Sequence, residues 1–469
     1  MQKKRIAIIG GGGAGSVAAY ALNEHHDIHL YESESYLGGH ATTHFCEVKN
    51  KNIPVDLGVE YFSEKQAPNL FALLNHFNIR TYVAPLSVSA SSHNGDLFWS
   101  NTSTESITDK SLIDEFARFH YQMHEVLHFN NYPKTMNLRT FLEKENYSRR
   151  FIYKALLPLL TTFSSCKSPI LDYSLMFCAL SFSMGLLSFF HPTYWRKSKD
   201  GISSYLQKIQ NHLQDKIYLN TPVENVIRHD NQITVCSKRG KEVFDQVIFA
   251  THADISLKLL DAPSPLEKEI LGSYEYTQIQ CVLHQDENIL IQSTNCKTYC
   301  EFNGNSNSKD TDFEGCLTRQ INLLPSFESI DPKLLVTYDP HIDIQSNKII
   351  TEKRWKIPKL RPADIALRRC LINIQGHLNT WYCGTDSSFT GHEGAIVSGL
   401  VIANFLGAPY KFQDNNWAKI QFDVVKGLMS LYKPLEKISN SFHKNIFHVS
   451  KFLNMRQSQV SRVLLDMYG

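Results

Sequence analysis

The sequence has almost no excess of charge of either sign. Its 48 lysine and arginine residues are balanced by 46 aspartate and glutamate residues, which leaves a formal net charge of +2 at pH 7. No basic run is long enough to follow a phosphate backbone, so we expect no nucleic-acid partner. With 42% hydrophobic and 20% charged residues over 469 positions, the composition is typical of a globular chain of two or three domains.

Cysteine spacing typical of metal or redox sites is also absent. The 10 cysteines are scattered between Cys46 and Cys383, and the closest approach to a paired motif is Cys296 with Cys300. We therefore expect reduced thiols, a cytoplasmic location and no metal site.

Long hydrophobic runs are missing as well. After a basic start at residues 1–5, only four apolar residues precede a run of glycines, which is too short for a signal peptide. Residues 173–190 carry no charge, but four serines and a glycine among these 18 residues make a membrane-spanning helix unfavourable. We predict a buried helix of a substrate domain there, suited to a large apolar pocket.

The most informative motif is a glycine-rich turn between a predicted strand and a predicted helix. The apolar residues 6–9 precede Gly10, Gly12 and Gly15, and a second predicted strand ends at Glu32, 22 residues after Gly10. Such glycines allow a tight turn, close approach of the backbone to a pyrophosphate, and close packing of helix on strand. The acid can accept hydrogen bonds from a ribose. The pattern therefore predicts a dinucleotide held at the helix N-terminus.

Two further glycine-bearing segments favour FAD over a nicotinamide dinucleotide. Gly38 and Gly39 follow the acid closely, where the flavin end of FAD would continue. Near the far end of the sequence, a predicted strand leads into Gly384 and Asp386, and a helix opens near Gly391. This second helix N-terminus suits the flavin and ribitol side. Asp386 is placed to accept a hydrogen bond from a ribitol hydroxyl.

These motifs resemble those of the flavin-containing amine oxidase superfamily. Within it, residues 37–42 and 250–254, together with His392 and Glu393, resemble a bacterial branch of predicted NAD/FAD-binding oxidoreductases. The likeness covers about residues 1–408 in order. It implies non-covalent FAD and oxidation of a C–N or C–C bond by hydride transfer to the flavin. The implied fold class is α/β, with a Rossmann-like FAD-binding domain of amine oxidase/glutathione reductase type interleaved with an α+β substrate domain.

Carried over residue by residue, the resemblance implies a cofactor site built from both ends of the sequence. The candidate cofactor-binding residues are Gly10, Gly12, Gly13, Ala14, Gly15, Glu32, Ser33, Gly38, Gly39, His40, Gly58, Val223, Gly384, Asp386, Glu393, Gly394 and Ala395. Val223 is expected to meet the adenine end through its backbone. His40 stands beside the Gly-Gly pair, where many relatives have an arginine.

Two departures from the superfamily pattern bear on the reaction. Amine oxidases of this type usually carry a lysine near the flavin N5, in a strand that aligns with residues 277–284, and this strand has glutamine instead. They also usually have an aromatic residue just before Glu-Gly-Ala, where this chain has Gly391 and His392. We therefore predict a desaturase or dehydrogenase that acts on an apolar, lipid-like small molecule. The alternatives are an amine oxidase with a changed N5 neighbour, and a catalytically idle FAD-binding scaffold.

The catalytic residues are not fixed by the sequence. His284, at a predicted strand end, is a weak candidate for a general base, and His392 is a weak candidate for a group that tunes the flavin ring. Tyr61, Trp195 and Trp355 are candidates for an aromatic wall of the substrate site.

We predict that six consecutive segments make up the chain. The FAD-binding domain takes residues 1–90, 201–261 and 369–410, and the substrate domain takes a helical insert at 91–200 and a sheet at 262–368. Residues 411–469 form a basic helical tail, with nine Lys and Arg against four Asp and Glu, a balance of +5. The tail is either packed on the protein or lies as a basic amphipathic element on an anionic membrane surface. The sequence does not predict the oligomeric state.

Overall fold

The computed structural model describes most of the chain up to residue 430. Its described residues are 2–430 except 85, 94, 103–109, 129–130, 163, 165–168, 184–194, 230–231, 291–296, 305–314, 326, 329 and 389–390. The predictions for residues 431–469 of the tail, for the second part of the stretch 173–190 and for Cys296 lie outside the described residues.

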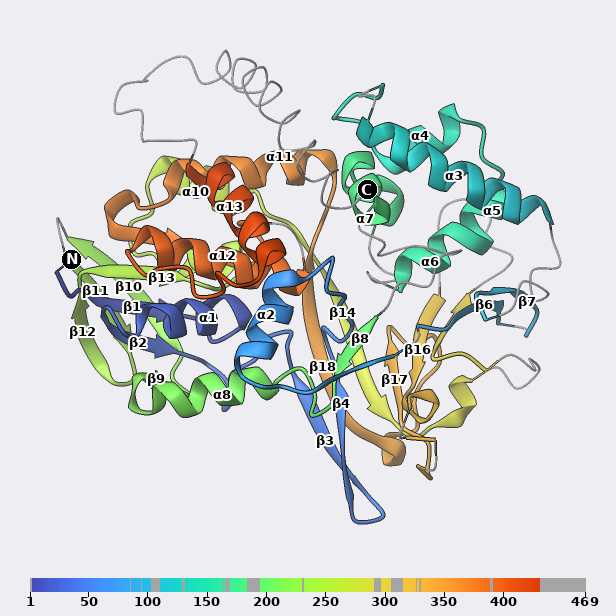
Figure 1. The fold of residues 1–469 in the computed structure, drawn as a ribbon, viewed down its shortest axis with the longest axis horizontal. Helices are drawn as coiled ribbons and strands as arrows, with labels where there is room; N and C mark the ends of the chain where they lie inside the picture. The colour runs from blue at the N-terminus through green and yellow to red at the C-terminus, as the bar shows by residue number, and fades with distance from the viewer. Residues whose placement is uncertain are drawn as a thin grey trace.

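A five-stranded parallel sheet is assembled from three distant parts of the sequence. Its strands, in spatial order, are β19 (Thr380–Tyr382), β13 (Gln246–Phe249), β1 (Arg5–Ile9), β2 (Asp27–Tyr31) and β9 (Ile217–Tyr218). The central strand β1 is apolar and buried, as a parallel strand covered on both faces must be. Figure 1 shows this sheet in one half of the molecule, with α1 (Gly13–Leu22) and α12 (Gly391–Phe405) beside it. The predicted α/β class with a Rossmann-like domain is confirmed.

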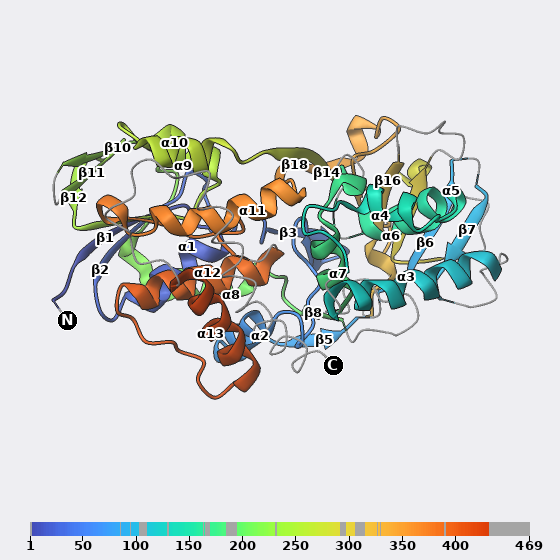
Figure 2. The same cartoon turned by 90° about the horizontal axis from the view of Figure 1, so that it is seen from above.

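The other half contains a larger, mainly antiparallel sheet with helices above it (Figure 1). In spatial order its strands are β18 (Ile349–Pro358), β14 (Tyr276–His284), β17 (Leu335–Tyr338), β16 (Gly315–Gln320), β15 (Cys300–Gly304), β6 (Val88–Ser92) and β7 (Leu97–Ser100). The pair β15 and β6 is parallel, although the two strands are about 200 residues apart in sequence. Figure 2 shows the long strands β14 and β18 running between the two halves. These two strands therefore connect the two halves, which also face each other directly.

Shorter sheets and further helices complete the fold. The remaining strands are β3 (Thr43–Val48), β4 (Lys51–Asp56), β5 (Thr81–Val83), β8 (Arg196–Ser198), β10 (Val223–His229), β11 (Gln232–Ser237) and β12 (Gly240–Phe244). The remaining helices are α2 (Pro68–His76), α3 (Lys110–His128), α4 (Leu138–Lys144), α5 (Arg149–Phe151), α6 (Leu157–Thr161), α7 (Leu175–Ser183), α8 (Ser204–Leu213), α9 (Ala253–Leu259), α10 (Pro265–Gly272), α11 (Pro362–Cys370) and α13 (Asn416–Ser430). A π-helical turn at Ile152–Leu156 joins α5 to α6.

Several local predictions differ from the structure in detail. The segment predicted as mostly helical at 91–200 also contains β7 and β8, and the segment predicted as a sheet at 262–368 also contains α10 and α11. The boundaries of the six segments remain predictions. The helix predicted within 173–190 is α7, and most of its side chains are buried.

No helix in the described ranges is both long enough and apolar enough to cross a membrane. The described part of the tail forms α13, which packs against α2 and α12. Trp417 and Ile420 on α13 are exposed. Peripheral membrane contact by the tail remains a prediction.

Two glycines allow α1 to pack directly against its neighbours. A Cβ atom on Gly15 would lie 2.0 Å from the carbonyl oxygen of Gly10, and a Cβ atom on Gly399 would lie 2.3 Å from that of Ala14. Both distances are far below van der Waals contact, so no larger residue fits without moving the backbone. The N-terminal glycine turn and the C-terminal helix are thereby held together.

We predict that Gly399→Ala destabilises the protein by about 1–3 kcal/mol, because the methyl group forces α1 and α12 apart. Gly427→Ala on α13 is the matched control, since its Cβ would meet nothing within 4 Å and alanine favours a helix. Chemical denaturation of both variants measures the difference. Equal stability of the two variants contradicts the proposed close contact.

Candidate functional site

A cavity of about 1530 Å³ lies between the two halves of the molecule. This volume exceeds the roughly 300–1,000 Å³ of an ordinary small-ligand site, so the cavity has room for more than one small molecule. Its walls come from the glycine turn at Gly10, from α7 at Met176 and Phe177, and from β18 at Trp355. Residues from both ends of the sequence thus meet around one space.

At one end of the cavity, the two N-terminal glycine segments lie side by side. Gly12 and Gly38 form a parallel β-bridge, and the Gly38 N–H donates to the Gly11 carbonyl at 3.0 Å. The carboxylate of Glu32 accepts from the N–H of Gly11 at 2.6 Å and from that of Glu34 at 2.9 Å. The acid at the end of β2 therefore also fixes the glycine turn.

The structure gathers most of the predicted cofactor residues around this cavity. The lining residues among them are Gly10, Gly12, Gly13, Ala14, Glu32, Ser33, Gly38, Gly39, His40, Gly58, Val223, Gly384, Asp386, Glu393 and Ala395. Gly15 and Gly394 are not among the lining residues. Gly15 acts instead through its close contact with Gly10.

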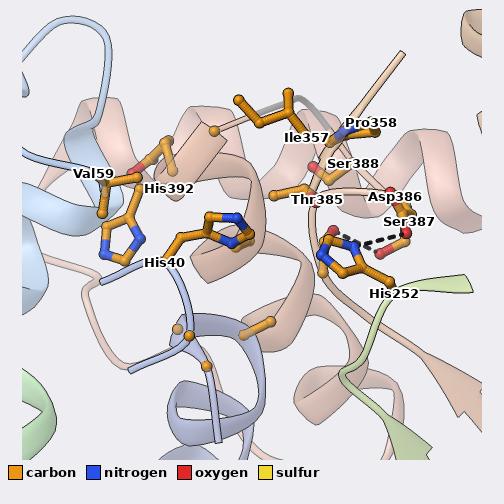
Figure 3. A pocket seen from close by; sticks show the side chains of 18 of the residues that line it. His40, Val59, His252, Ile357, Pro358, Thr385, Asp386, Ser387, Ser388 and His392 are labelled. Carbon is orange, nitrogen blue, oxygen red and sulfur yellow. Dashed lines mark hydrogen bonds and ion pairs between the residues drawn. The ribbon is translucent and has the colours of Figure 1, made fainter. Parts of the chain in front are cut away.

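Asp386 is a buried acceptor that lines the same cavity. Its Oδ2 accepts from the Tyr276 hydroxyl at 2.7 Å and from the Ala253 N–H at 3.1 Å, and it lies 3.8 Å from Nδ1 of His252. Figure 3 shows His252 beside Asp386 on this wall. Burial alone would raise the pKa of Asp386, but His252 and Tyr276 outweigh it and lower the pKa. Asp386 is therefore held as a carboxylate.

Two neutral histidines face the space on the other side in Figure 3. Burial lowers the pKa of His40 to about 4, with His252 adding to the effect, and burial lowers that of His392 to about 4. His40 packs on Trp355 with ring centroids 4.9 Å apart. His392 Nε2 lies 3.1 Å from the Tyr205 hydroxyl. Both rings can serve as uncharged hydrogen-bonding groups.

Glu393 has a structural contact that the sequence did not predict. Its carboxylate accepts from the backbone N–H of Asn69 and of Leu70, each at 2.8 Å, and so caps the N-terminus of α2. Asn69 in turn accepts from the Tyr410 hydroxyl at 2.8 Å and donates to Gln421 at 2.9 Å. Glu393 thus ties α12, α2 and α13 together, while it also lines the cavity.

Buried polar atoms without a hydrogen-bond partner are concentrated at this cavity. In the described ranges, nine residues carry such side-chain atoms, and all except Asp254 line the cavity. One of these atoms, Glu60 Oε2, is paired with the Arg319 guanidinium at 2.7 Å. The other seven lining residues are His40, Tyr61, Gln66, Arg319, Arg368, Asp386 and Ser388. Since orphaned buried groups cost about 1–3 kcal/mol each, their clustering indicates a place where ligands supply the partners.

Sequence reasoning missed several residues of this wall. Arg368 on α11 has two buried nitrogens without partners, and no local pattern marks it as a site residue. His252 lies three residues after the end of β13, and the carboxyl edge of a parallel strand was a signal that could have identified it.

The weak prediction of a catalytic role for His284 is not supported by its position. The residue is fully buried in β14 and does not line the cavity. Its Nε2 lies 2.8 Å from the Thr337 hydroxyl, and its Nδ1 accepts from the Asp286 N–H at 3.1 Å. His392 and the predicted aromatic residues Tyr61, Trp195 and Trp355 do line the cavity.

The last turn of α3 contains a His-Glu-x-x-His sequence, at His124, Glu125 and His128. This spacing occurs in zinc-binding helices. Among the side chains that the structure describes, no three metal-ligating groups come together.

Comparisons with known proteins agree with this architecture. A family model for an NAD(P)-binding Rossmann-like domain matches residues 8–77. No curated protein sequence matches the chain. Among solved structures, wild-type putrescine oxidase bound to putrescine is 15% identical, with a TM-score of 0.63 over 87% of this chain and 100% of that chain.

Two further structural neighbours are named for different activities. A CLA-producing fatty acid isomerase from P. acnes is 15% identical, with a TM-score of 0.63 over 86% of this chain and 98% of that chain. Cyclohexylamine oxidase from Brevibacterium oxydans IH-35A is 12% identical, with a TM-score of 0.63 over 86% of this chain and 100% of that chain. The predicted resemblance is confirmed at the level of the fold.

The raised pKa of Glu393 predicts that the stability of the protein depends on pH. Burial raises its pKa from 4.5 to about 7, against the hydrogen bonds from α2 that lower it. Its contribution is therefore full below about pH 4.5 and is lost as the pH rises through about 7. Relative to Glu393→Gln, the free energy of unfolding of the wild type should fall by about 3 kcal/mol across this window.

Urea denaturation of both proteins between about pH 5 and 8 measures this difference. Glu64→Gln is the control, because the Glu64 side chain is 55% exposed. A constant difference between the wild type and Glu393→Gln over the whole range contradicts the prediction.

Proposed function

We propose that this protein is an FAD-dependent oxidoreductase that dehydrogenates or desaturates an apolar, lipid-like molecule. The observation that carries the proposal is the continuity of one cavity from Gly12 and Glu32, at the dinucleotide fingerprint, to Met176 and Phe177 on α7. A single space with a cofactor end and an apolar end suits a reaction between a bound cofactor and a bound apolar substrate.

The residues of the cofactor end are compatible with an elongated dinucleotide. The N-terminus of α1 at Gly12 can receive the pyrophosphate, and Glu32 can accept from a ribose. Asp386 offers an unpartnered Oδ1 for a hydroxyl donor, and Arg368 offers unpartnered N–H groups for an anionic oxygen. Bound there, FAD supplies a ring that accepts hydride from a substrate C–H bond.

The residues of the apolar end can orient a substrate and exclude water. The apolar side chains on this part of the wall include Leu160, Ile170, Met176, Phe177, Leu180, Trp195 and Leu360. Trp195 immediately precedes β8, and the others belong to α6, α7 and the segments next to them or pack against the same core. An aliphatic chain enclosed here presents its C–H bonds without competing solvent.

An amine oxidase is the second candidate, since two structural neighbours are named as amine oxidases. The side chains that β14 contributes to the cavity wall argue against an amine oxidase. Ile279 lines the cavity, whereas Gln278 and Gln280 do not. The cavity-lining lysine Lys356 donates to Asp254 at 2.6 Å. The fatty acid isomerase among the neighbours supports the lipid-like alternative.

We predict that Arg368→Gln weakens FAD binding by about tenfold or more, because it removes a charge-assisted donor from a buried site. Arg80→Gln is the matched control, since the Arg80 side chain is 68% exposed. The measurement is titration of cofactor-depleted protein with FAD, together with the FAD released from fresh protein on heating. If freshly purified protein is colourless and does not bind added FAD, the proposed cofactor is wrong.

Anaerobic mixing with panels of lipids and amines tests the reaction itself. We expect loss of the oxidised-flavin absorbance with a lipid-like compound and no loss with primary amines. Bleaching by amines alone identifies the amine oxidase alternative. A flavin that stays oxidised with every compound, in a protein that binds a partner tightly, favours the scaffold.

A further inference from the structure

Five side chains form a buried polar group at the cavity, here named the Glu60 cluster: Glu60, Tyr61, Lys197, Tyr299 and Arg319. Of these, Glu60, Tyr61 and Arg319 line the cavity. Arg319 Nη1 lies 2.7 Å from Glu60 Oε2, and Lys197 Nζ and the Tyr299 hydroxyl both contact Glu60 Oε1. The side chains of Glu60, Lys197 and Arg319 are only 1%, 6% and 12% exposed. Burying ionic groups this deeply carries a desolvation cost, which ion pairing and hydrogen bonds within the cluster offset.

The charges of the cluster do not suit a cationic ligand. The single carboxylate of Glu60 faces two cationic side chains, Lys197 and Arg319, so its charge is already compensated. Burial lowers the pKa of Lys197 to about 7, and with Lys197 neutral the three groups sum to zero rather than to a negative charge. Asp56 does not line the cavity, and its Oδ1 accepts from Thr43 and from the Ile202 N–H. A protonated amine would meet no uncompensated acid on the wall.

The cluster leaves two hydrogen-bond donors without a partner in residues that line the cavity. Arg319 and Tyr61 both line it, and Arg319 Nε and the Tyr61 hydroxyl are buried without partners. The rest of the guanidinium is fixed, because Nη1 also donates to the Tyr338 hydroxyl at 2.9 Å. An arginine can only donate, so the missing partner must be an acceptor. A carboxylate fits best, because with Lys197 protonated the three charged groups sum to +1, and the Nε–H of Arg319 can then donate a charge-assisted hydrogen bond to an anionic oxygen.

The surroundings of these donors are apolar and aromatic. The Tyr61 ring meets Trp195 edge-on at a centroid distance of 6.1 Å, and it meets Tyr299 in the same way at 5.6 Å. Ile279 and Leu360 line the same cavity. A ligand that satisfies the donors therefore has an apolar body next to an acidic head.

We propose that the Glu60 cluster binds the carboxylate of an otherwise apolar substrate, with Arg319 and Tyr61 as direct donors and Glu60 and Lys197 as positioning residues. The inference rests on the proposed function, because it assigns the substrate class of the same chamber. It goes further in excluding amines by charge and in naming the groups that select the acid.

The test compares oleate, oleyl alcohol and oleylamine, which share one hydrocarbon chain and differ in the head group. Each is titrated into the full-length protein with its FAD bound, below the micelle concentration, and tryptophan fluorescence is recorded because Trp195 and Trp355 line the cavity. We expect oleate to bind at least tenfold more tightly than oleylamine, with the alcohol between them. Oleylamine binding as tightly as oleate overturns the proposal.

Two variants identify the donors. Tyr61→Phe leaves no partner unpaired in the ligand-free protein, and we expect it to lower the oleate affinity about fivefold without changing that of the alcohol. We expect Arg319→Gln to lower the oleate affinity at least tenfold, and Arg139→Gln, whose side chain is 44% exposed, to leave it unchanged. A merely structural role for the cluster would lower the affinities for all three probes together.

The readout also separates the two proposals. Equal binding of the three probes contradicts the assignment of the head group and leaves the apolar chamber intact. Failure of all three to bind contradicts both the chamber and the carboxylate site. Both outcomes are read from binding alone and do not require the flavin to be reduced.

Discussion

The direct contact between α1 and α12 is the constraint on which the cavity depends. Residues almost 400 positions apart meet here, because Gly399 has no side chain to separate its helix from Ala14. Gly15 makes the equivalent approach to Gly10 on the other side of α1. Two helix N-termini are thereby brought to one space, and each presents unsatisfied N–H groups and a positive dipole end to an anionic ligand. Without this contact, the N-terminal and C-terminal glycine segments would not meet at one cavity.

Two buried carboxylates near this contact have opposite roles because their surroundings differ. Hydrogen bonds and the nearby His252 outweigh the effect of burial at Asp386 and lower its pKa, so it remains an ionised acceptor at the cavity. At Glu393 burial prevails and raises the pKa to about 7, and the side chain serves the backbone of α2. One acid is thus available to a ligand, whereas the other maintains the shape of the wall. Burial alone does not distinguish them; the partners of each group do.

The two halves of the molecule supply different parts of the cavity. The parallel sheet supplies the edge where β1, β13 and β19 end and the glycine turns begin, which is where α/β proteins bind nucleotides. The seven-stranded sheet and the helices above it supply much of the chamber wall, including Ile279, Trp355 and the Arg319 side chain. The Glu60 partner of Arg319 comes from outside this sheet. Neighbours of the same fold are named as amine oxidases and as a fatty acid isomerase, so the fold by itself does not determine the substrate.

The sequence alone determined the glycine turn, the flanking strands of the parallel sheet and the acids at Glu32 and Asp386. These features are local, so spacing within a few dozen residues is enough to identify them. Tertiary structure alone decided the wall of the chamber. The strand register pairs Ile279 with Trp355, and alternation along β14 then directs Gln278 and Gln280 to the other face and leaves His284 within the sheet. The pairing of Glu60 with Arg319 and the position of Arg368 on α11 also join distant elements. No pattern along the chain encodes such contacts, because they arise only when separate sheets and helices pack together.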